Sequence, residues 1–236
     1  LFAAHGIGLD DNVSLFLKNS VEHVTSLLGL LKVRAVPVNV NYRYTNAELG
    51  YIFDNSDSRG IVVEEPDHQR SVATLLAELP LVRTVFVIGD VVDELSAAAR
   101  DLPDGRTVEV VSFGESEELP DKRDFEERTG DEHYLLYTGG TTGYPKGVIW
   151  SHDDFFRKPI SGGNPYGEAR KDLAEIGAAV KDFPSIAFNI AAPLMHGAAS
   201  YSLFTFLTLG GRLVLMRDFD PEAIVSGIES EQIQII

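Results

Sequence analysis

Hydrophobic residues in the N-terminal half of the chain fall into two kinds of run that alternate. Short runs rich in β-branched residues are typical of buried strands, and they occupy residues 12–17, 35–40, 60–64, 84–88 and 107–111. Longer stretches with helical spacing separate the later strands, at residues 67–78 and 90–100. Strands that alternate with helices favour a parallel sheet covered by helices, so the pattern predicts an α/β fold with mostly parallel, helix-covered sheets.

Two further helices have recognisable starts. Asn19 and Ser20 can cap a helix whose apolar face we expect to carry Val21, Val24, Leu28 and Leu31. Thr45 precedes Glu48 by three residues, which is the spacing of a capping box. We therefore expect helices to begin just after residues 20 and 45.

The C-terminal half repeats the alternation after a polar interval. Residues 112–133 are acidic, lack a sustained apolar period and predict a surface connection. Ser151 or Asp153 can cap a short helix, and we expect another near residues 168–181. Strands at 185–190 and 212–216 surround an apolar helix at 198–209, and Pro221 opens a last helix. We thus expect a first α/β region at 1–111, an acidic connection at 112–133 and a third region at 134–236.

Composition narrows the class of protein. The chain has 236 residues, 44% of them hydrophobic, which is typical of a folded globular protein. No apolar run reaches membrane-spanning length, and cysteine is absent, so disulfides and cysteine chemistry are excluded. We expect a cytoplasmic protein. The net charge of −16 disfavours nucleic acid as a partner, because no basic surface is available for phosphates.

The ends of the chain suggest a piece of a longer protein. It begins at Leu1, and it ends at Ile235 and Ile236 within a predicted strand. An unshielded apolar strand would expose a hydrophobic edge. We therefore expect a fragment that is inactive by itself.

The strongest chemical signal is the segment Tyr-Thr-Gly-Gly-Thr-Thr-Gly-Tyr-Pro-Lys-Gly at residues 137–147, between two apolar runs that predict strands. Glycines can turn successive N–H groups into one concavity, and Lys146 adds a positive charge. Such a loop suits a polyphosphate. A Walker A loop is excluded, because Lys146 is followed by Gly147 and a strand rather than by Ser or Thr and a helix. The alternative is a plain hairpin turn with a solvated lysine.

This segment resembles the signature of the adenylate-forming superfamily, which includes acyl-CoA synthetases, aryl-CoA ligases, luciferases and peptide-synthetase adenylation domains. Two other segments also resemble family elements, namely residues 35–43, which end in Asn41-Tyr42-Arg43, and Pro193-Leu194-Met195-His196-Gly197. The resemblance implies part of the family's large N-terminal AMP-binding domain. Gly139 is a departure, because many members carry serine there, so that hydroxyl contact cannot be transferred.

The resemblance also implies the reaction and its residues. A carboxylic acid would be activated by ATP, with Mg²⁺, as an acyl-adenylate and then transferred to coenzyme A. The residues implied at the phosphates are Thr138, Gly139, Gly140, Thr141, Thr142, Gly143 and Lys146. Those implied at the acyl group are His196, Gly197 and Met195, with Lys146, Thr138 and His196 as the catalytic candidates. Neither the acid nor the oligomeric state follows from the sequence.

Several alternatives stay open. The chain could be a nucleotide-binding module without turnover, an adenylation domain that loads a carrier protein, or a luciferase-like oxidase. His196 could instead be bound to backbone at a helix start. His152, Asp153 and Asp154 could suggest a metal, but neighbouring helical residues point apart, so we expect a helix start and no metal site. Phe155, Phe156, Phe204 and Phe206 are expected in the core, with Phe204 and Phe206 as candidates for an acyl tunnel.

Overall fold

The computed structural model describes residues 1–117, 119, 125–139, 143–182 and 184–236. The chain forms two compact units. The first comprises Leu1–Leu17 and Glu22–Ile149, and the second comprises Lys18–Val21 and Trp150–Ile236. Lys18–Val21 thus belongs to the second unit although it lies within the stretch of sequence that forms the first.

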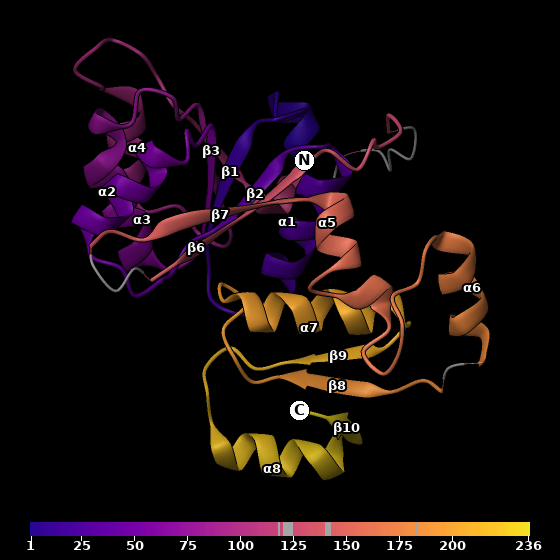
Figure 1. Ribbon diagram of the computed structural model, residues 1–236. Helices are drawn as coiled ribbons and strands as arrows, with labels where there is room; N and C mark the ends of the chain where they lie inside the picture. Colours follow the sequence, from indigo (N-terminus) through magenta and orange to yellow (C-terminus); the bar gives the residue numbers. More distant parts are fainter. Residues whose placement is uncertain (118, 120–124, 140–142, 183) are drawn as a thin grey trace. The chain divides into compact units, whose positions relative to one another are not determined.

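The first unit contains a sheet with the strand order β5-β4-β3-β1-β2-β6-β7 (Figure 1). The strands are β1 (Asn12–Phe16), β2 (Val36–Asn39), β3 (Gly60–Val63), β4 (Thr84–Val87), β5 (Glu109–Ser112), β6 (His133–Thr138) and β7 (Lys146–Ser151). All pairs from β5 to β6 are parallel. Residues 139–145 are too short for the crossover that a parallel pair needs, so β6 and β7 form an antiparallel hairpin.

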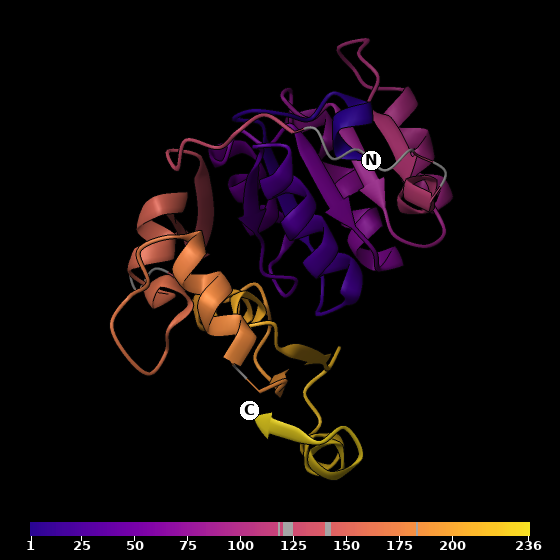
Figure 2. The ribbon, with the colours of Figure 1, turned by 90° about the vertical axis from the view of Figure 1, so that its right-hand side faces the viewer.

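Helices cover both faces of this sheet. They are α1 (Val21–Lys32), α2 (Asn46–Asn55), α3 (Pro66–Leu75) and α4 (Asp93–Arg100), with short 3-10 turns at Phe2–His5, Leu76–Glu78 and Phe113–Glu117. Helices α2, α3 and α4 pack side by side on one face, and α1 lies on the other (Figures 1 and 2). Such a doubly wound arrangement confirms the predicted fold class.

The core follows the alternation of side chains along the strands. Phe16, Val38 and Val63 belong to the cluster beneath α2, α3 and α4. Val13 and Leu15 are also buried but do not belong to that cluster, which is what the period of a strand requires.

The predicted apolar face of α1 is wrong in part, because only Val24 of its four predicted residues is buried. Val21 is 65% exposed, and Leu28 and Leu31 are only partly buried. The buried residues of α1 are His23, Val24, Ser26, Leu27 and Leu30. The sequence does not reveal the buried face for two reasons. That face includes the polar residues His23 and Ser26, and the leucines at 27, 28, 30 and 31 are compatible with two different apolar faces.

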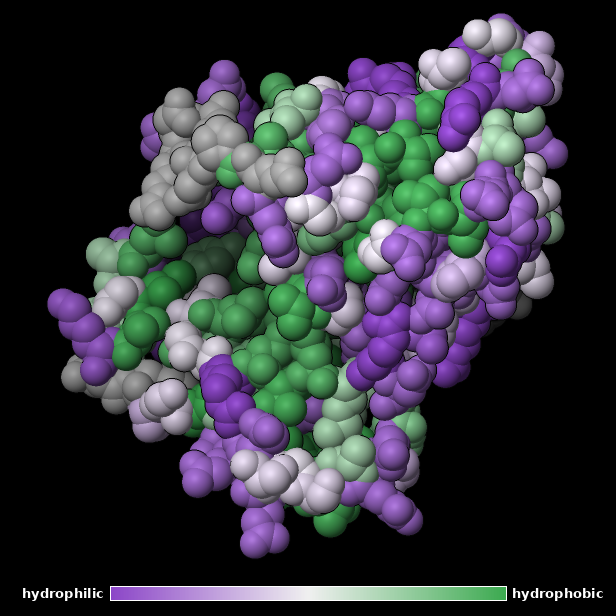
Figure 3. Space-filling view, turned by 180° about the vertical axis from the view of Figure 1, so that it is seen from behind, coloured by the Kyte–Doolittle hydropathy of each residue, from purple (hydrophilic) through white to green (hydrophobic). Residues whose placement is uncertain are grey.

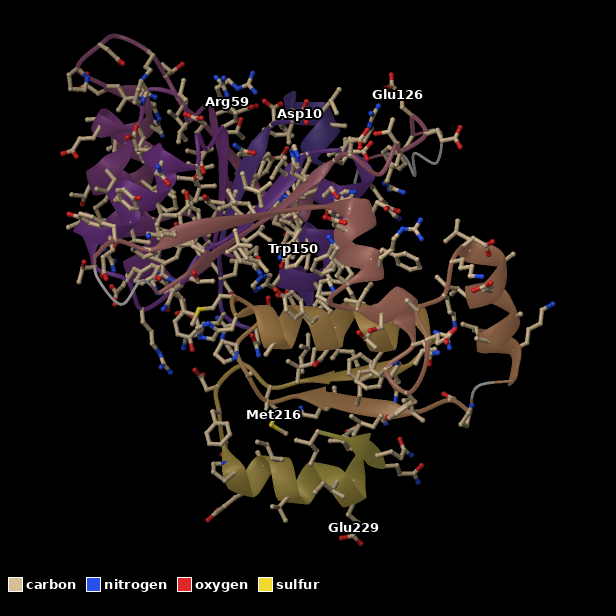
Figure 4. All side chains as sticks on the ribbon, in the orientation of Figure 1. Asp10, Arg59, Glu126, Trp150, Met216 and Glu229 are labelled. Atoms are coloured by element: carbon tan, nitrogen blue, oxygen red, sulfur yellow. The ribbon has the colours of Figure 1, made fainter. Side chains whose placement is uncertain are left out.

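The second unit is built on a parallel sheet of β8 (Ala187–Ile190), β9 (Arg212–Leu215) and β10 (Ile233–Ile235), in the order β10-β8-β9. Its helices are α5 (His152–Arg157), α6 (Leu173–Asp182), α7 (Gly197–Thr208) and α8 (Pro221–Ser230), with a 3-10 turn at Ser161–Gly163. Helix α7 covers one face of the sheet and α8 the other (Figure 1). Met216, just after β9, lies between the sheet and α8 (Figure 4).

Helix α6 begins later than the sequence predicts. The segment before it forms a loop, in which the Asn164 side chain donates to the carbonyl of Glu168 at 2.8 Å. The Asp172 carboxylate then accepts from the backbone N–H of Glu175 at 2.9 Å, as a helix cap does. The start at residue 168 is therefore wrong, because Asp172 supplies a cap that the apolar periodicity does not reveal.

Hydrophobic residues reach the surface among hydrophilic ones on the face shown in Figure 3. The most exposed large hydrophobic side chains of the described residues include Leu173, Tyr166 and Phe219. Within the described part of the chain, no helix has the length and apolar character needed to cross a membrane.

Candidate functional site

The hairpin between β6 and β7 carries the glycine- and threonine-rich loop. Gly140, Thr141 and Thr142 lie outside the described residues. Thr138 ends β6 and Lys146 begins β7, so these two candidates face each other across the base of the loop. The Thr138 hydroxyl donates to the backbone carbonyl of Lys146 over 3.5 Å, and both side chains are exposed. The base of the hairpin therefore brings the Thr138 hydroxyl to the backbone of Lys146 and leaves both side chains open to solvent.

Two positions of this hairpin require glycine for different reasons. Gly143 has a φ of 150°, a conformation that residues with a side chain rarely adopt. Gly147 lies in an ordinary strand, but a Cβ there would approach Leu135 Cδ1 to 3.0 Å and the Tyr137 ring to 3.4 Å. Residue 143 must therefore be glycine because of its backbone conformation, and residue 147 must be glycine because β6 and β7 approach closely.

Tyrosines hold both arms of the loop to α2. The Tyr144 ring stacks on Tyr51, with the ring centroids 4.4 Å apart and the planes at 25°. The Tyr137 hydroxyl donates to Asn55 Oδ1 at 2.8 Å. Burial, with smaller contributions from Tyr51 and Asp57, raises the pKa of Tyr137 to about 12, so this donor stays protonated at neutral pH. Sequence reasoning missed these anchors, because nothing local links α2 to the hairpin.

The second group of candidates occupies the turn between β8 and α7 in the second unit. His196 directly precedes the first residue of α7 and is exposed, whereas Met195 is only 4% exposed. Gly197 opens the helix, and a Cβ there would meet the Tyr201 ring at 3.1 Å. The turn thus sends Met195 inward and His196 outward, and it needs glycine beside Tyr201.

A cavity of about 360 Å³ lies beside this turn, within the second unit. Small residues from the start of α7 (Ala198, Ala199, Ser202) line it together with Phe188 and Phe206. Its volume is in the range of small-molecule sites. Of the two phenylalanines expected at a tunnel, only Phe206 lines this cavity.

Phe204 belongs instead to an aromatic cluster around Phe155. Its ring lies 5.2 Å from Phe155, and Tyr201 lies 5.6 Å from Phe155. Trp150, at the end of β7, completes the cluster at 6.4 Å (Figure 4). Edge-to-face contacts of this kind stabilise packing, so the cluster supports α5 and α7.

The residues His152, Asp153 and Asp154 form a helix start, as expected. The Ser151 hydroxyl accepts from the backbone N–H of Asp154 at 3.1 Å, and Asp153 pairs with Arg157 one turn along. Within the described ranges, no group of three or more His, Cys, Asp or Glu side chains could hold a metal ion.

The first unit is a doubly wound α/β sheet with a Gly/Thr-rich hairpin loop, and the second unit has its own parallel sheet, so the chain is an α/β protein. The sequence model of the AMP-binding enzyme family matches residues 1–236, and the chain belongs to this family.

Its relatives include CoA ligases. It is 36% identical to the 3-oxocholest-4-en-26-oate–CoA ligase of Rhodococcus rhodochrous over 239 residues, which cover 98% of this chain and 40% of the relative. It is 37% identical to the medium/long-chain-fatty-acid–CoA/3-oxocholest-4-en-26-oate–CoA ligase of Mycolicibacterium smegmatis over 236 residues, with the same coverage. The chain thus spans about 40% of the length of these curated relatives.

Solved structures agree on the fold. A long-chain-fatty-acid–CoA ligase from Archaeoglobus fulgidus matches with a TM-score of 0.70 and 22% identity, over 98% of this chain and 40% of that one. The N-terminal domain of FACL13 from Mycobacterium tuberculosis matches with a TM-score of 0.66 and 23% identity, over 98% of this chain and 50% of that one. The chain therefore has the fold of part of the N-terminal domain of adenylate-forming enzymes.

Proposed function

We propose that this chain supplies the phosphate-binding and acyl-binding parts of an ATP-dependent acid–CoA ligase. The observation that carries the proposal is the hairpin loop, which brings Thr138 and Lys146 together in a chain whose relatives are CoA ligases. The reaction has two steps. The carboxylate oxygen of the acid bonds to the α-phosphorus of ATP as pyrophosphate leaves. The thiol of CoA then loses its proton and bonds to the acyl carbon as AMP leaves.

Each candidate residue has a role in this reaction. Negative charge grows on the departing pyrophosphate, and donors placed along it stabilise the transition state more than the ground state. In this proposal Thr138, Lys146 and the backbone N–H groups of Gly139 and Gly143 bind the phosphates. Gly140, Thr141 and Thr142 are proposed to join them, although they lie outside the described residues. Mg²⁺, bound mostly by phosphate oxygens and water as is usual for nucleotides, would share the charge.

The acyl side is assigned to the second unit. His196 is exposed at the turn before α7 and would contact the acid near its carboxyl group, with Gly197 leaving room beside it. Met195 is buried and would support the wall of the pocket. The cavity beside the turn is apolar on most sides, so we propose that it accepts a sizeable apolar acid.

Lys146→Ala in the full-length enzyme tests the proposal. We expect carboxylate-dependent exchange of pyrophosphate into ATP to fall by about a hundredfold or more, the scale seen when one preorganised donor is removed. Lys158→Ala is the matched control, because Lys158 is also an exposed lysine but pairs with Asp154 on the surface of α5. Near-normal exchange in a folded Lys146→Ala variant would refute the role of the loop.

A further inference from the structure

Asn19 makes two hydrogen bonds to the turn that carries His196. Its side-chain oxygen Oδ1 accepts from the backbone N–H of Leu194 at 2.7 Å, and its Nδ2 donates to the carbonyl of Ala192 at 3.2 Å. Asn19 is only 5% exposed. One side-chain amide therefore binds the backbone on both sides of Pro193, much as a neighbouring peptide group would.

The turn needs such an external partner. Pro193 has no N–H, so the backbone cannot form a regular pattern of donors there. A buried N–H that loses its acceptor costs free energy comparable to a lost hydrogen bond, and Leu194 is 1% exposed. Asn19 removes that cost at the point where the proline interrupts the pattern.

Other polar groups of the turn are bound by the turn itself and by the first turn of α7. The N–H of His196 donates to the carbonyl of Pro193 at 3.0 Å. The Ser200 hydroxyl, one turn into α7, donates to the carbonyl of Leu194 at 2.9 Å and its N–H donates to the carbonyl of His196 at 3.1 Å. Asn19 on one side and Ser200 on the other thus fix the backbone between them, while the His196 side chain stays exposed.

The segment that carries Asn19 also contains Lys18, which makes an exposed contact within the same unit. Lys18 forms an ion pair with Asp218 at 3.0 Å, and the Asp218 side chain is 68% exposed. An exposed pair of this kind contributes little to stability. The buried amide of Asn19 is therefore the stronger tie of the two.

We propose that Asn19 is a positioning residue for His196. It acts by fixing the Pro193–His196 backbone, so that the imidazole meets the acid in one orientation. This inference rests on the proposed function only in giving His196 a role on the acyl side. The hydrogen bonds themselves do not depend on it. A small displacement of a positioned group can lower the rate of a reaction by a large factor, which is why a residue that never touches the substrate can matter.

Kinetics of the full-length enzyme test the effect on the reaction. We expect Asn19→Ala to lower kcat/KM for the carboxylic acid by about tenfold or more and to leave the KM for ATP within about twofold. Asn19→Asp keeps the acceptor for Leu194 and should recover part of the loss. Lys18→Ala, which removes the exposed ion pair with Asp218 in the same segment, is the matched control and should behave as the wild type.

A double mutant shows whether Asn19 acts through His196. In a His196→Ala background, adding Asn19→Ala should change kcat/KM by less than about twofold, because the positioned group is gone. Additive losses, or equal losses for ATP and acid, would overturn the proposal. If Asn19→Ala does not fold, Asn19→Asp carries the same comparison.

Hydrogen exchange separates this proposal from the proposed function. The amide of Leu194 should exchange at least about tenfold faster in Asn19→Ala than in Lys18→Ala. Unchanged exchange would overturn the inference whatever the activity. Faster exchange in an enzyme that activates no acid would refute the proposed function and still establish Asn19 as the anchor of this turn.

Discussion

At the scale of single residues, the candidate phosphate loop is held by contacts outside its own motif. Tyr144 stacks on Tyr51, and Tyr137 donates to Asn55, so both arms of the hairpin are tied to α2. The hydroxyl, N–H and lysine groups of the motif are the proposed phosphate donors, whereas its two tyrosines contact residues of α2 outside the motif. The sequence predicts the proposed donors from their local chemistry. It could not predict the contacts of the tyrosines, because Tyr137 and Asn55 are 82 positions apart.

Gly143 allows a test of backbone conformation in this loop. A Cβ at Gly143 or at Gly139 would meet nothing within 4 Å, but only Gly143 has a positive φ, of 150°. We expect Gly143→Ala to reduce kcat/KM for ATP by about tenfold, since the added strain of about 1–2 kcal/mol shifts the loop away from its binding conformation. Steady-state kinetics with ATP as the varied substrate measure this.

Gly139→Ala is the control, because it keeps the same N–H and adds the same methyl group without the strained φ. We expect a change of less than about threefold in kcat/KM for ATP. An equal effect of both substitutions would show that the methyl group itself, rather than backbone strain, disturbs the loop.

At the scale of elements, the polar signals of the sequence were more reliable than its apolar periodicity. The capping box of α2 is confirmed, and Ser151 and Asp220 cap α5 and α8. By contrast, the predictions of the buried face of α1 and of the start of α6 were wrong, the first of them in part. A cap is a local interaction between neighbours in sequence, so its residues identify it. The face that a helix buries is set by what packs against it, which a short apolar pattern does not contain.

Thr45 provides a measure of what such a cap contributes. Its hydroxyl accepts from the N–H of Glu48 at 3.4 Å, and the Glu48 carboxylate accepts from the N–H of Thr45 at 2.8 Å. We expect Thr45→Ala to lower the free energy of unfolding by about 1 kcal/mol, and Thr45→Ser to preserve it. Urea denaturation of the three proteins at neutral pH is the measurement. A loss as large in Thr45→Ser would attribute the effect to the threonine methyl group.

At the scale of the whole molecule, one buried carboxylate is expected to contribute to stability in acid. Glu132 is 3% exposed. Burial would raise its pKa, but hydrogen bonds from the N–H groups of Thr129 and Gly130 and from Arg34 outweigh burial and lower it from 4.5 to about 2. The unfolded chain therefore binds a proton more readily between these values. The contribution is complete above pH 4.5 and is lost as the pH falls towards 2.

We expect this contribution to be on the order of 3 kcal/mol, since one pKa unit corresponds to about 1.4 kcal/mol. The free energy of unfolding of the wild type should approach that of Glu132→Gln as the pH falls from 4.5 to 2, when both are measured by urea denaturation. Glu126→Gln is the control, because Glu126 binds the same Arg34 at 2.9 Å but is 83% exposed. A constant difference between wild type and Glu132→Gln across this range would contradict the prediction.

The cavity of the second unit leads to a prediction about the acid. Each buried methylene is worth about 0.8 kcal/mol, so a few of them decide between acids in an apolar cavity of about 360 Å³. We expect the full-length enzyme to have a higher kcat/KM for octanoate or a bulky ring-bearing acid than for acetate. Ser202→Phe, which fills the cavity from α7, should lower kcat/KM for the large acids more than for acetate. A preference of the wild type for acetate would refute the assignment of the cavity.

The division of the molecule into two units could be predicted only in part. The change from β-branched runs to a polar interval predicts a boundary near residues 112–133, but β6 and β7, which follow this interval, belong to the first sheet, and the first unit continues to Ile149. Lys18–Val21 belongs to the second unit, although the residues before and after it in sequence belong to the first. Both facts depend on contacts between residues far apart in sequence, and no local composition reports them.

This interleaving matters to anyone who wishes to exchange C-terminal regions between this chain and its relatives. A transplant of residues 150–236 alone would carry the His196 turn but leave Asn19 behind, so a foreign residue 19 would meet the backbone of Ala192 and Leu194. Because an amide is what satisfies both groups, a chimera should work best when residues 18–21 travel with the transplanted half. The useful breakpoints of this molecule are therefore three, and two of them lie close to the N-terminus, far in sequence from the turn that Asn19 contacts.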